Sequence, residues 1–231
     1  MTETAVPRPP APAADAAQKP RYQNIAERCM RNVFITPIAV IDWPECAEMN
    51  AGLRAQCLER ESQDSGMKRS NIGGWHSNTD LLNWGGPHVE ELGRRLRRFL
   101  IDLTSTLSRS EDRNKEREYM ISAWANVSRD GQYNTMHDHP KAHWSGVYYV
   151  CCDGLRDDIP VNAMLELHDP RAGTSMFPFK GMVMTERPRF EPVAGRMVVF
   201  PSWLRHSVHP YRGDDVRISI AFNATVRLKD E

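Results

Sequence analysis

The feature that most constrains the fold is a run of short β-branched segments after residue 118, separated from one another by turn residues. The expected strands are residues 119–127, 145–152, 163–167, 181–185, 196–200 and 216–225. Turn signals such as Asp130-Gly131 and Ala194-Gly195 lie between them. Many short strands joined by turns are typical of a barrel or a jelly roll.

Two helices are expected ahead of these strands. Apolar side chains recur at helical spacing through residues 89–107, over about five turns. Residues 44–57 predict an earlier helix that Pro44 opens, and residues 32–42 predict one more strand. Helices followed by strands favour a mainly β fold with flanking helices packed against one sheet.

The amino-acid composition limits the classes of partner and the compartment that are expected. The 30 basic and 30 acidic residues cancel, so no global field favours nucleic acid or an anionic membrane as a partner. Five cysteines without a CxxC pair predict neither a disulfide framework nor a zinc site, which favours the cytoplasm. No secretory signal or membrane span is visible. Residues 1–20 form an expected disordered Pro/Ala-rich tail, and residues 21–231 an expected single domain.

A histidine pair marks the start of the segment SGVYYV. His137 and His139 flank Asp138, and in an extended chain residues i and i+2 point the same way. Both histidines can therefore approach one metal ion, while Asp138 points to the opposite face. The alternative is a polar turn in which the histidines meet only solvent.

A second segment carries His206, then Arg217 eleven residues later and Ser219 two residues further on. A charged Arg217 in the apolar run VRISIAFN is costly to bury unless an anion meets it. A metal held on a few side chains leaves positions open for a bidentate ligand, and an arginine can hold that ligand's distal carboxylate by a forked pair. A structural salt bridge at a sheet edge is the alternative for Arg217.

These stretches together resemble the bacterial and phage family of 2-oxoglutarate–iron(II) oxygenases, which is related to the prolyl hydroxylase-type enzymes. The matching stretches are RSNIGGWHS, His137-x-His139 with SGVYYV, Asp169-Pro170-Arg171, FPSWLRHSV and RISIAFN. They span residues 33 to 225, nearly the whole expected domain. The resemblance implies a cupin-like jelly roll, the double-stranded β-helix.

The resemblance also implies the roles of the site residues. The catalytic iron would be bound by the His137 region and by His206, and Arg217 with Ser219 would bind the C5 carboxylate of 2-oxoglutarate. In the wider superfamily an Asp or Glu stands two residues after the first histidine, where this chain has His139.

The third ligand is therefore open at this point. His139 would complete a three-histidine metal site. Alternatively, a twisted loop could bring Asp138 to the iron, or the position could be vacant or filled from elsewhere, for example by Asp169. The period of two in an extended chain favours His139.

Other residues carry weaker predictions. Asn126 and Tyr148 could hydrogen-bond 2-oxoglutarate, with sheet packing as the alternative. Trp75, His76 and Trp144 could line a substrate pocket, although large aromatic side chains are more often part of a core.

The function that follows is oxidation of a C–H bond with Fe(II), O₂ and 2-oxoglutarate, which leaves as succinate and CO₂. Hydroxylation is the default outcome, with desaturation or cyclisation as variants. A small molecule is the expected substrate, for example an amino acid or a natural-product intermediate, and a homodimer is compatible with the sequence. The alternatives are a three-histidine cupin-like dioxygenase without cosubstrate, against which Arg217 and Ser219 argue, and a non-catalytic binding barrel.

Overall fold

The computed structural model describes residues 34–173 and 187–229. The chain divides into two units, Met1–Ile35 and Thr36–Glu231, and every element below belongs to the second. The expected tail at residues 1–20 and the expected strand at 181–185 lie outside the described residues.

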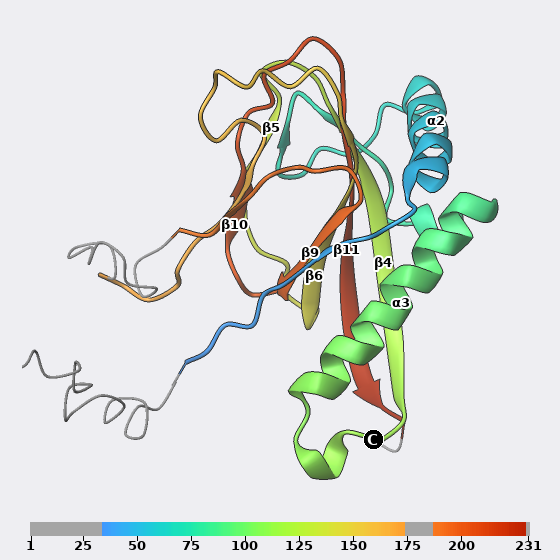
Figure 1. Ribbon diagram of the computed structural model, residues 1–231, viewed down its shortest axis with the longest axis vertical. Coiled ribbons are helices and arrows are strands. Elements are labelled where there is room, and N and C mark those ends of the chain that lie inside the picture. Colours follow the sequence, from blue (N-terminus) through green and yellow to red (C-terminus); the bar gives the residue numbers. More distant parts are fainter. Residues whose placement is uncertain (1–33, 174–186, 230–231) are drawn as a thin grey trace, which may run out of the picture. The chain divides into compact units, whose positions relative to one another are not determined.

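Two antiparallel sheets form the body of this unit (Figure 1). In spatial order the larger sheet consists of β1 (Ala39–Asp42), β9 (Arg196–Pro201), β6 (Trp144–Cys152), β11 (Arg217–Leu228), β4 (Arg117–Ser128) and β3 (Trp75–His76). The smaller sheet consists of β2 (Asn71–Ile72), β5 (Tyr133–His137), β10 (His206–Val208), β7 (Leu165–Leu167) and β8 (Arg189–Phe190). Strands distant in sequence are thus neighbours in space, as in a jelly roll.

Both expected helices are confirmed, although the first begins at Ala47 and is not opened by Pro44. They are α2 (Ala47–Gln63) and α3 (Pro87–Leu107), with short 3₁₀ turns η1 (Leu81–Asn83) and η2 (Ser110–Asp112). Pro87 occupies the first turn of α3, where its missing N–H costs nothing. Both helices pack on one face of the larger sheet. Within the described residues no helix is long and apolar enough to cross a bilayer.

The central strand β11 separates two interiors. Ile218, Ile220 and Phe222 are fully buried on the side of the helices, in the larger core. The alternating residues Ser219 and Ala221 face a cavity between the two sheets. Each face of β11 is therefore enclosed, but only one of the two is apolar throughout.

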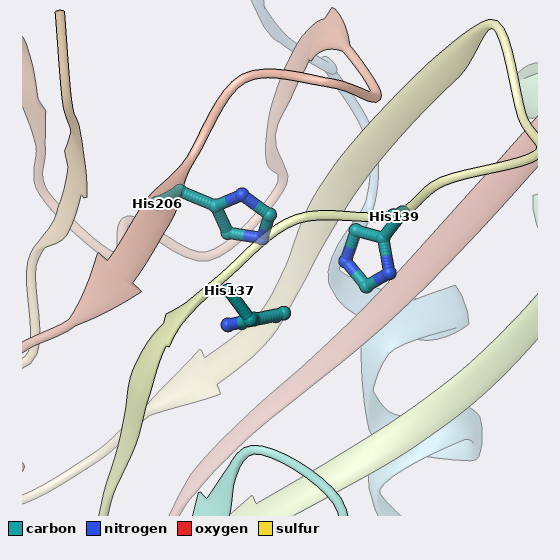
Figure 2. A group of neighbouring side chains, drawn as sticks. All are labelled: His137, His139 and His206. Atoms are coloured by element: carbon teal, nitrogen blue, oxygen red, sulfur yellow. The ribbon is translucent and has the colours of Figure 1, made fainter. Parts of the chain in front are cut away.

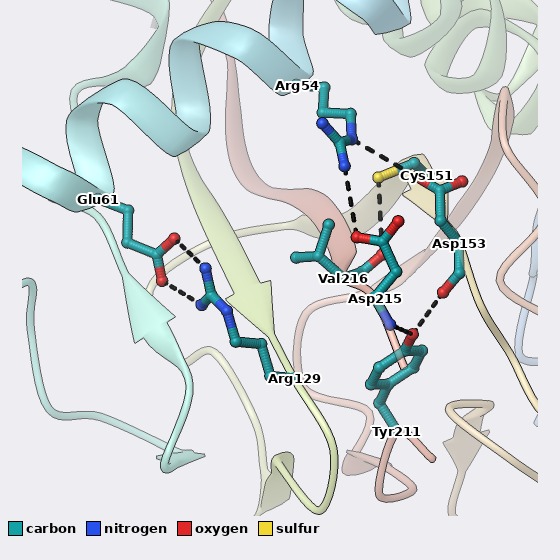
Figure 3. Close-up of polar contacts among 8 residues, drawn as sticks. All are labelled: Arg54, Glu61, Arg129, Cys151, Asp153, Tyr211, Asp215 and Val216. Atoms are coloured by element: carbon teal, nitrogen blue, oxygen red, sulfur yellow. Dashed lines mark hydrogen bonds and ion pairs between the residues drawn. The ribbon is translucent and has the colours of Figure 1, made fainter. Parts of the chain in front are cut away.

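Polar contacts attach α2 to the end of the larger sheet at which β11 begins (Figure 3). Arg54 of α2 lies 3.4 Å from the carboxylate of Asp153 and 3.4 Å from that of Asp215. Arg129 forms a forked pair with Glu61, at 2.6 and 2.8 Å. Each exposed pair contributes little alone, but together they hold the chain just before the site strand.

Candidate active site

Three histidines converge at one edge of the cavity (Figure 2). His137 ends β5 and His206 begins β10, and the two are directly paired across the smaller sheet. His139 follows two residues after β5, where its backbone N–H donates to the Ser202 carbonyl at 2.9 Å. One ligand nitrogen from each ring lies within 4.8 Å of the others. This spacing suits three imidazoles around one first-row metal ion.

Local hydrogen bonds set the orientation of two of these rings. The Nδ1 of His137 lies 2.7 Å from the Thr135 carbonyl, and the Nδ1 of His206 lies 2.9 Å from the Leu204 carbonyl. A carbonyl only accepts, so each Nδ1 carries the proton and each Nε2 presents its lone pair to a metal. The Nε2 of His137 also lies 3.4 Å from the Ser70 hydroxyl.

The surroundings also keep the rings neutral. Burial lowers the pKa of His137, lowers that of His139 to about 4, and lowers that of His206 to about 3. Their mutual proximity lowers the latter two further. Neutral imidazole is the form that binds metal, so the cluster is competent as a ligand set at neutral pH.

The carboxylates considered as third ligands point elsewhere. Asp138 is exposed and lies 3.8 Å from the guanidinium of Arg205. Asp169 forms an ion pair with Arg171 at 2.6 Å. Among the described residues, the histidines alone form the metal-sized group.

Arg217 lies deeper in the same cavity and is 2% exposed. Its Nη1 donates to the Ser219 hydroxyl at 3.2 Å, and its guanidinium lies 5.3 Å from the centre of the Tyr149 ring. Its Nε has no hydrogen-bond partner, and no carboxylate within the described chain lies at ion-pair distance. The predicted structural salt bridge is thus not formed there.

Two further buried polar atoms of the cavity lining have no hydrogen-bond partner. They are the Tyr149 hydroxyl and the Asn126 Oδ1. Ser219 stands between the two side chains, because it is aligned with Asn126 on β4 and with Tyr149 on β6. A buried cation and unpaired polar groups cost free energy unless a ligand satisfies them. A carboxylate fits the donors here, since it can accept from the guanidinium and from the hydroxyls of Tyr149 and Ser219, whereas the Asn126 Oδ1 calls for a donor.

The expectation for Tyr148 is corrected. Its hydroxyl donates to Asn50 Oδ1 of α2 at 2.6 Å, so the side chain points away from the cavity into the larger core. Its neighbour Tyr149 occupies the expected position. Both side chains are fully buried, and burial alone therefore does not distinguish the two faces of β6.

The predicted aromatic wall is only partly formed. His76 lines the cavity, but Trp75 and Trp144 pack into the larger core and do not. Trp124 was not predicted to line the site, but its ring stacks on that of His76 at 5.5 Å and lies 5.5 Å from the His139 ring. Its alternation with Asn126 on β4 was the available signal.

The cavity has a volume of about 700 Å³ and is lined by strands of both sheets. This is the size of a site for a small ligand. Fold and site together define a metal-dependent enzyme of the double-stranded β-helix class.

Comparisons with known proteins narrow that class. Residues 122–223 match the family model described as "Putative 2OG-Fe(II) oxygenase". The match covers the three histidines and Arg217. The expected enzyme class and its cofactors, Fe(II) and 2-oxoglutarate, are thereby confirmed. No curated protein sequence matches the chain.

Solved structures support the fold. A Pseudomonas putida prolyl-4-hydroxylase aligns with a TM-score of 0.59 at 15% identity, over 82% of this chain and 92% of that one. The carbocyclase SnoK from nogalamycin biosynthesis has a TM-score of 0.55 at 13% identity, over 82% and 79%. HygX from Streptomyces hygroscopicus, with nickel and 2-oxoglutarate bound, has a TM-score of 0.55 at 11% identity, over 82% and 83%. At such identities the likeness concerns the fold alone, and it confirms the double-stranded β-helix.

Proposed function

We propose that this protein oxidises a C–H bond of a small molecule, with Fe(II) held by His137, His139 and His206. Arg217 and Ser219 bind the C5 carboxylate of 2-oxoglutarate. Hydroxylation is the default outcome, and desaturation or cyclisation would use the same site.

The single observation that carries this proposal is the unpaired Arg217 in a cavity with three neutral histidines. Fully buried arginine without a carboxylate partner destabilises a protein, so its presence calls for an anionic ligand. Bound there, Fe(II) and 2-oxoglutarate would supply the oxidising chemistry: O₂ is consumed and the cosubstrate leaves as succinate and CO₂.

The chain's own residues position these groups and limit access to them. The carbonyls of Thr135 and Leu204 fix two imidazoles, and Arg217 with Tyr149 would fix the distal end of the cosubstrate. The stacked pair of His76 and Trp124 forms an apolar wall beside the metal position. Such fixed first contacts reduce the reorganisation that turnover requires.

Cavity size and charge favour a small substrate. A volume of about 700 Å³ is shared between cosubstrate and substrate. The net charge of zero gives nucleic acid no long-range attraction. One fold relative, SnoK, is a carbocyclase from nogalamycin biosynthesis, and small-molecule chemistry on this fold is therefore within its range.

The test uses the apo-protein without O₂. Fe(II) and 2-oxoglutarate should together produce the weak visible charge-transfer band of their chelate, and His206→Ala should abolish it together with iron-dependent succinate formation. Iron binding without the band would make a three-histidine dioxygenase without cosubstrate the leading function. No iron binding at all would make the protein a binding barrel.

A further inference from the structure

A second polar group lies on the cavity face of β11, four residues beyond Ser219. It is centred on Asn223, which is aligned with Ser122 of β4 and with Ser145 of β6. All three side chains line the cavity. Neither the metal position nor the Arg217 surroundings require them.

The hydrogen bonding of Asn223 leaves its donor end free. The buried Ser145, 1% exposed, donates from Oγ to Asn223 Oδ1 at 2.7 Å. This bond occupies the amide oxygen and fixes the orientation of the amide. Within the described structure the Nδ2 group has no acceptor, so its two N–H groups are available to a ligand.

The charge at this end of the cavity is positive. Lys141 lines it and forms no ion pair with any described residue. The carboxylate that also lines it, Asp138, already lies 3.8 Å from Arg205. Lys141 is held next to β11 because its carbonyl accepts from Thr225 Oγ1 at 3.3 Å.

The metal position lies between this group and Arg217. Trp124 is aligned with Ala221, midway between Ser219 and Asn223, and its ring lies 5.5 Å from that of His139. Ser219 and Asn223 are about 13 Å apart along the strand. A ligand held at Asn223 can therefore place a carbon near the metal without entering the Arg217 end.

We propose that Asn223 and Lys141 bind an anionic group of the substrate, either a carboxylate or a phosphoryl group. This inference rests on the proposed function and names its substrate class, a small organic acid. The C–H bond that is oxidised would lie away from the anionic group, on the part of the substrate that reaches the metal position. N–H donors beside an ammonium favour an anion, and a neutral amide would gain less. The cosubstrate and the substrate would thus be held by two anion sites on one face of one strand.

The experiment uses the protein loaded with Mn(II), a redox-inert paramagnetic substitute for iron, and saturated with 2-oxoglutarate. The probes are acetate, methylphosphonate and acetamide, whose methyl proton line widths report proximity to the manganese. We expect acetate or methylphosphonate to be broadened strongly and acetamide weakly. Whichever anion shows the larger effect identifies the source as carboxylate or phosphoryl.

Variants then assign the effect to the chain. Lys141→Ala should weaken binding of the anion about tenfold or more, as expected for a lost charged hydrogen bond, and Lys141→Arg should restore it. Asn223→Asp keeps an acceptor for Ser145 but replaces the donors by a charge that repels anions, so the broadening should fall to the acetamide level. Lys68→Ala, which removes an exposed lysine outside the cavity lining, is the matched control.

Equal broadening by acetate and acetamide, or broadening that survives both Lys141→Ala and Asn223→Asp, would overturn the inference. The methylene lines of 2-oxoglutarate are an internal check. If they are not broadened, the proposed function itself fails. If they are broadened and the anion probes are not, only the substrate inference fails.

Discussion

Among the residues that the structure describes, one carboxylate and one guanidinium side chain are almost completely buried, and their surroundings are opposite. Glu166 on β7 is 3% exposed and is met by Arg189 at 2.7 Å, His209 at 2.9 Å and Arg187 at 3.8 Å. Arg217 on β11 is 2% exposed and has only a hydroxyl and an aromatic ring beside it.

The difference separates a charge that the folded chain itself pairs from one that it leaves unpaired. Burial acts to raise the pKa of Glu166, but hydrogen bonds from Arg189 and His209 outweigh it and hold that pKa below its ordinary value of 4.5. The carboxylate is therefore stabilised by the folded chain itself. Arg217 lacks such stabilisation, and the chain retains an unpaired charge that only a ligand can satisfy.

The largest effect is expected for Arg217→Met, which keeps volume and removes charge. Affinity for 2-oxoglutarate should fall about 30- to 1000-fold, because a buried forked ion pair contributes about 2–4 kcal/mol. The free energy of unfolding of the apo-protein should not fall, because an uncompensated charge is removed. Succinate formation as a function of 2-oxoglutarate concentration measures the affinity, and urea unfolding measures the stability of the apo-protein. A destabilised apo-protein with unchanged affinity would make Arg217 structural.

Glu166→Gln should show the reverse pattern. The free energy of unfolding should fall by about 2–4 kcal/mol, since Arg187 and Arg189 lose their buried anionic partner. The affinity for 2-oxoglutarate should stay the same, because Glu166 does not line the cavity. Urea unfolding measures the loss of stability, and the same succinate assay measures the affinity for 2-oxoglutarate. A large loss of affinity would contradict a purely structural role for Glu166.

The pH dependence sharpens the same contrast. A carboxyl group whose pKa is lowered on folding stabilises the protein fully above its unfolded value and loses this contribution as pH falls through the folded value. The stability gap between wild type and Glu166→Gln should therefore be constant at neutral pH and begin to close as pH falls below about 4.5. Urea unfolding at a series of pH values tests this. A gap that widens on acidification would contradict the assignment.

The smallest effect distinguishes adjacent tyrosines. Tyr149→Phe should lower the affinity for 2-oxoglutarate about 10- to 100-fold, as expected for one hydrogen bond to a charged carboxylate. Tyr148→Phe should leave that affinity unchanged and cost about 1 kcal/mol of stability through the lost bond to Asn50. Equal effects of the two substitutions on affinity would contradict the placement of Tyr149 beside Arg217.

The long elements and the clustering of the three histidines were predicted better than the short strands. α3 and β11 contain 21 and 12 residues, and in each the apolar residues recur with the period of the element. A periodic pattern of this length predicts the type of element from the sequence alone. β5 and β10, which carry His137 and His206, have only five and three residues and no clear alternation. Pairing with neighbouring strands makes them strands, and a local pattern does not contain that information.

The error at Tyr148 has a related cause. β6 is the third strand of the larger sheet and is covered on both faces, so alternating polarity is lost along SGVYYV. The register with β11 also shifts between Ile218 and Ser219, which changes the alignment just beyond Tyr149. Counting residues from the histidines therefore did not identify the face of each tyrosine.

The carbonyls that orient His137 and His206 lie two residues before each ring along the chain, at Thr135 within β5 and at Leu204 in the turn before β10. The ring orientation thus depends on the local backbone and on the pairing of β5 with β10, not on the ion. Much of the conformational entropy that is lost when these two rings are oriented is therefore lost on folding, before any ion binds. Metal-free and metal-loaded protein should have nearly the same backbone in this region, and the ion should enter a preorganised site.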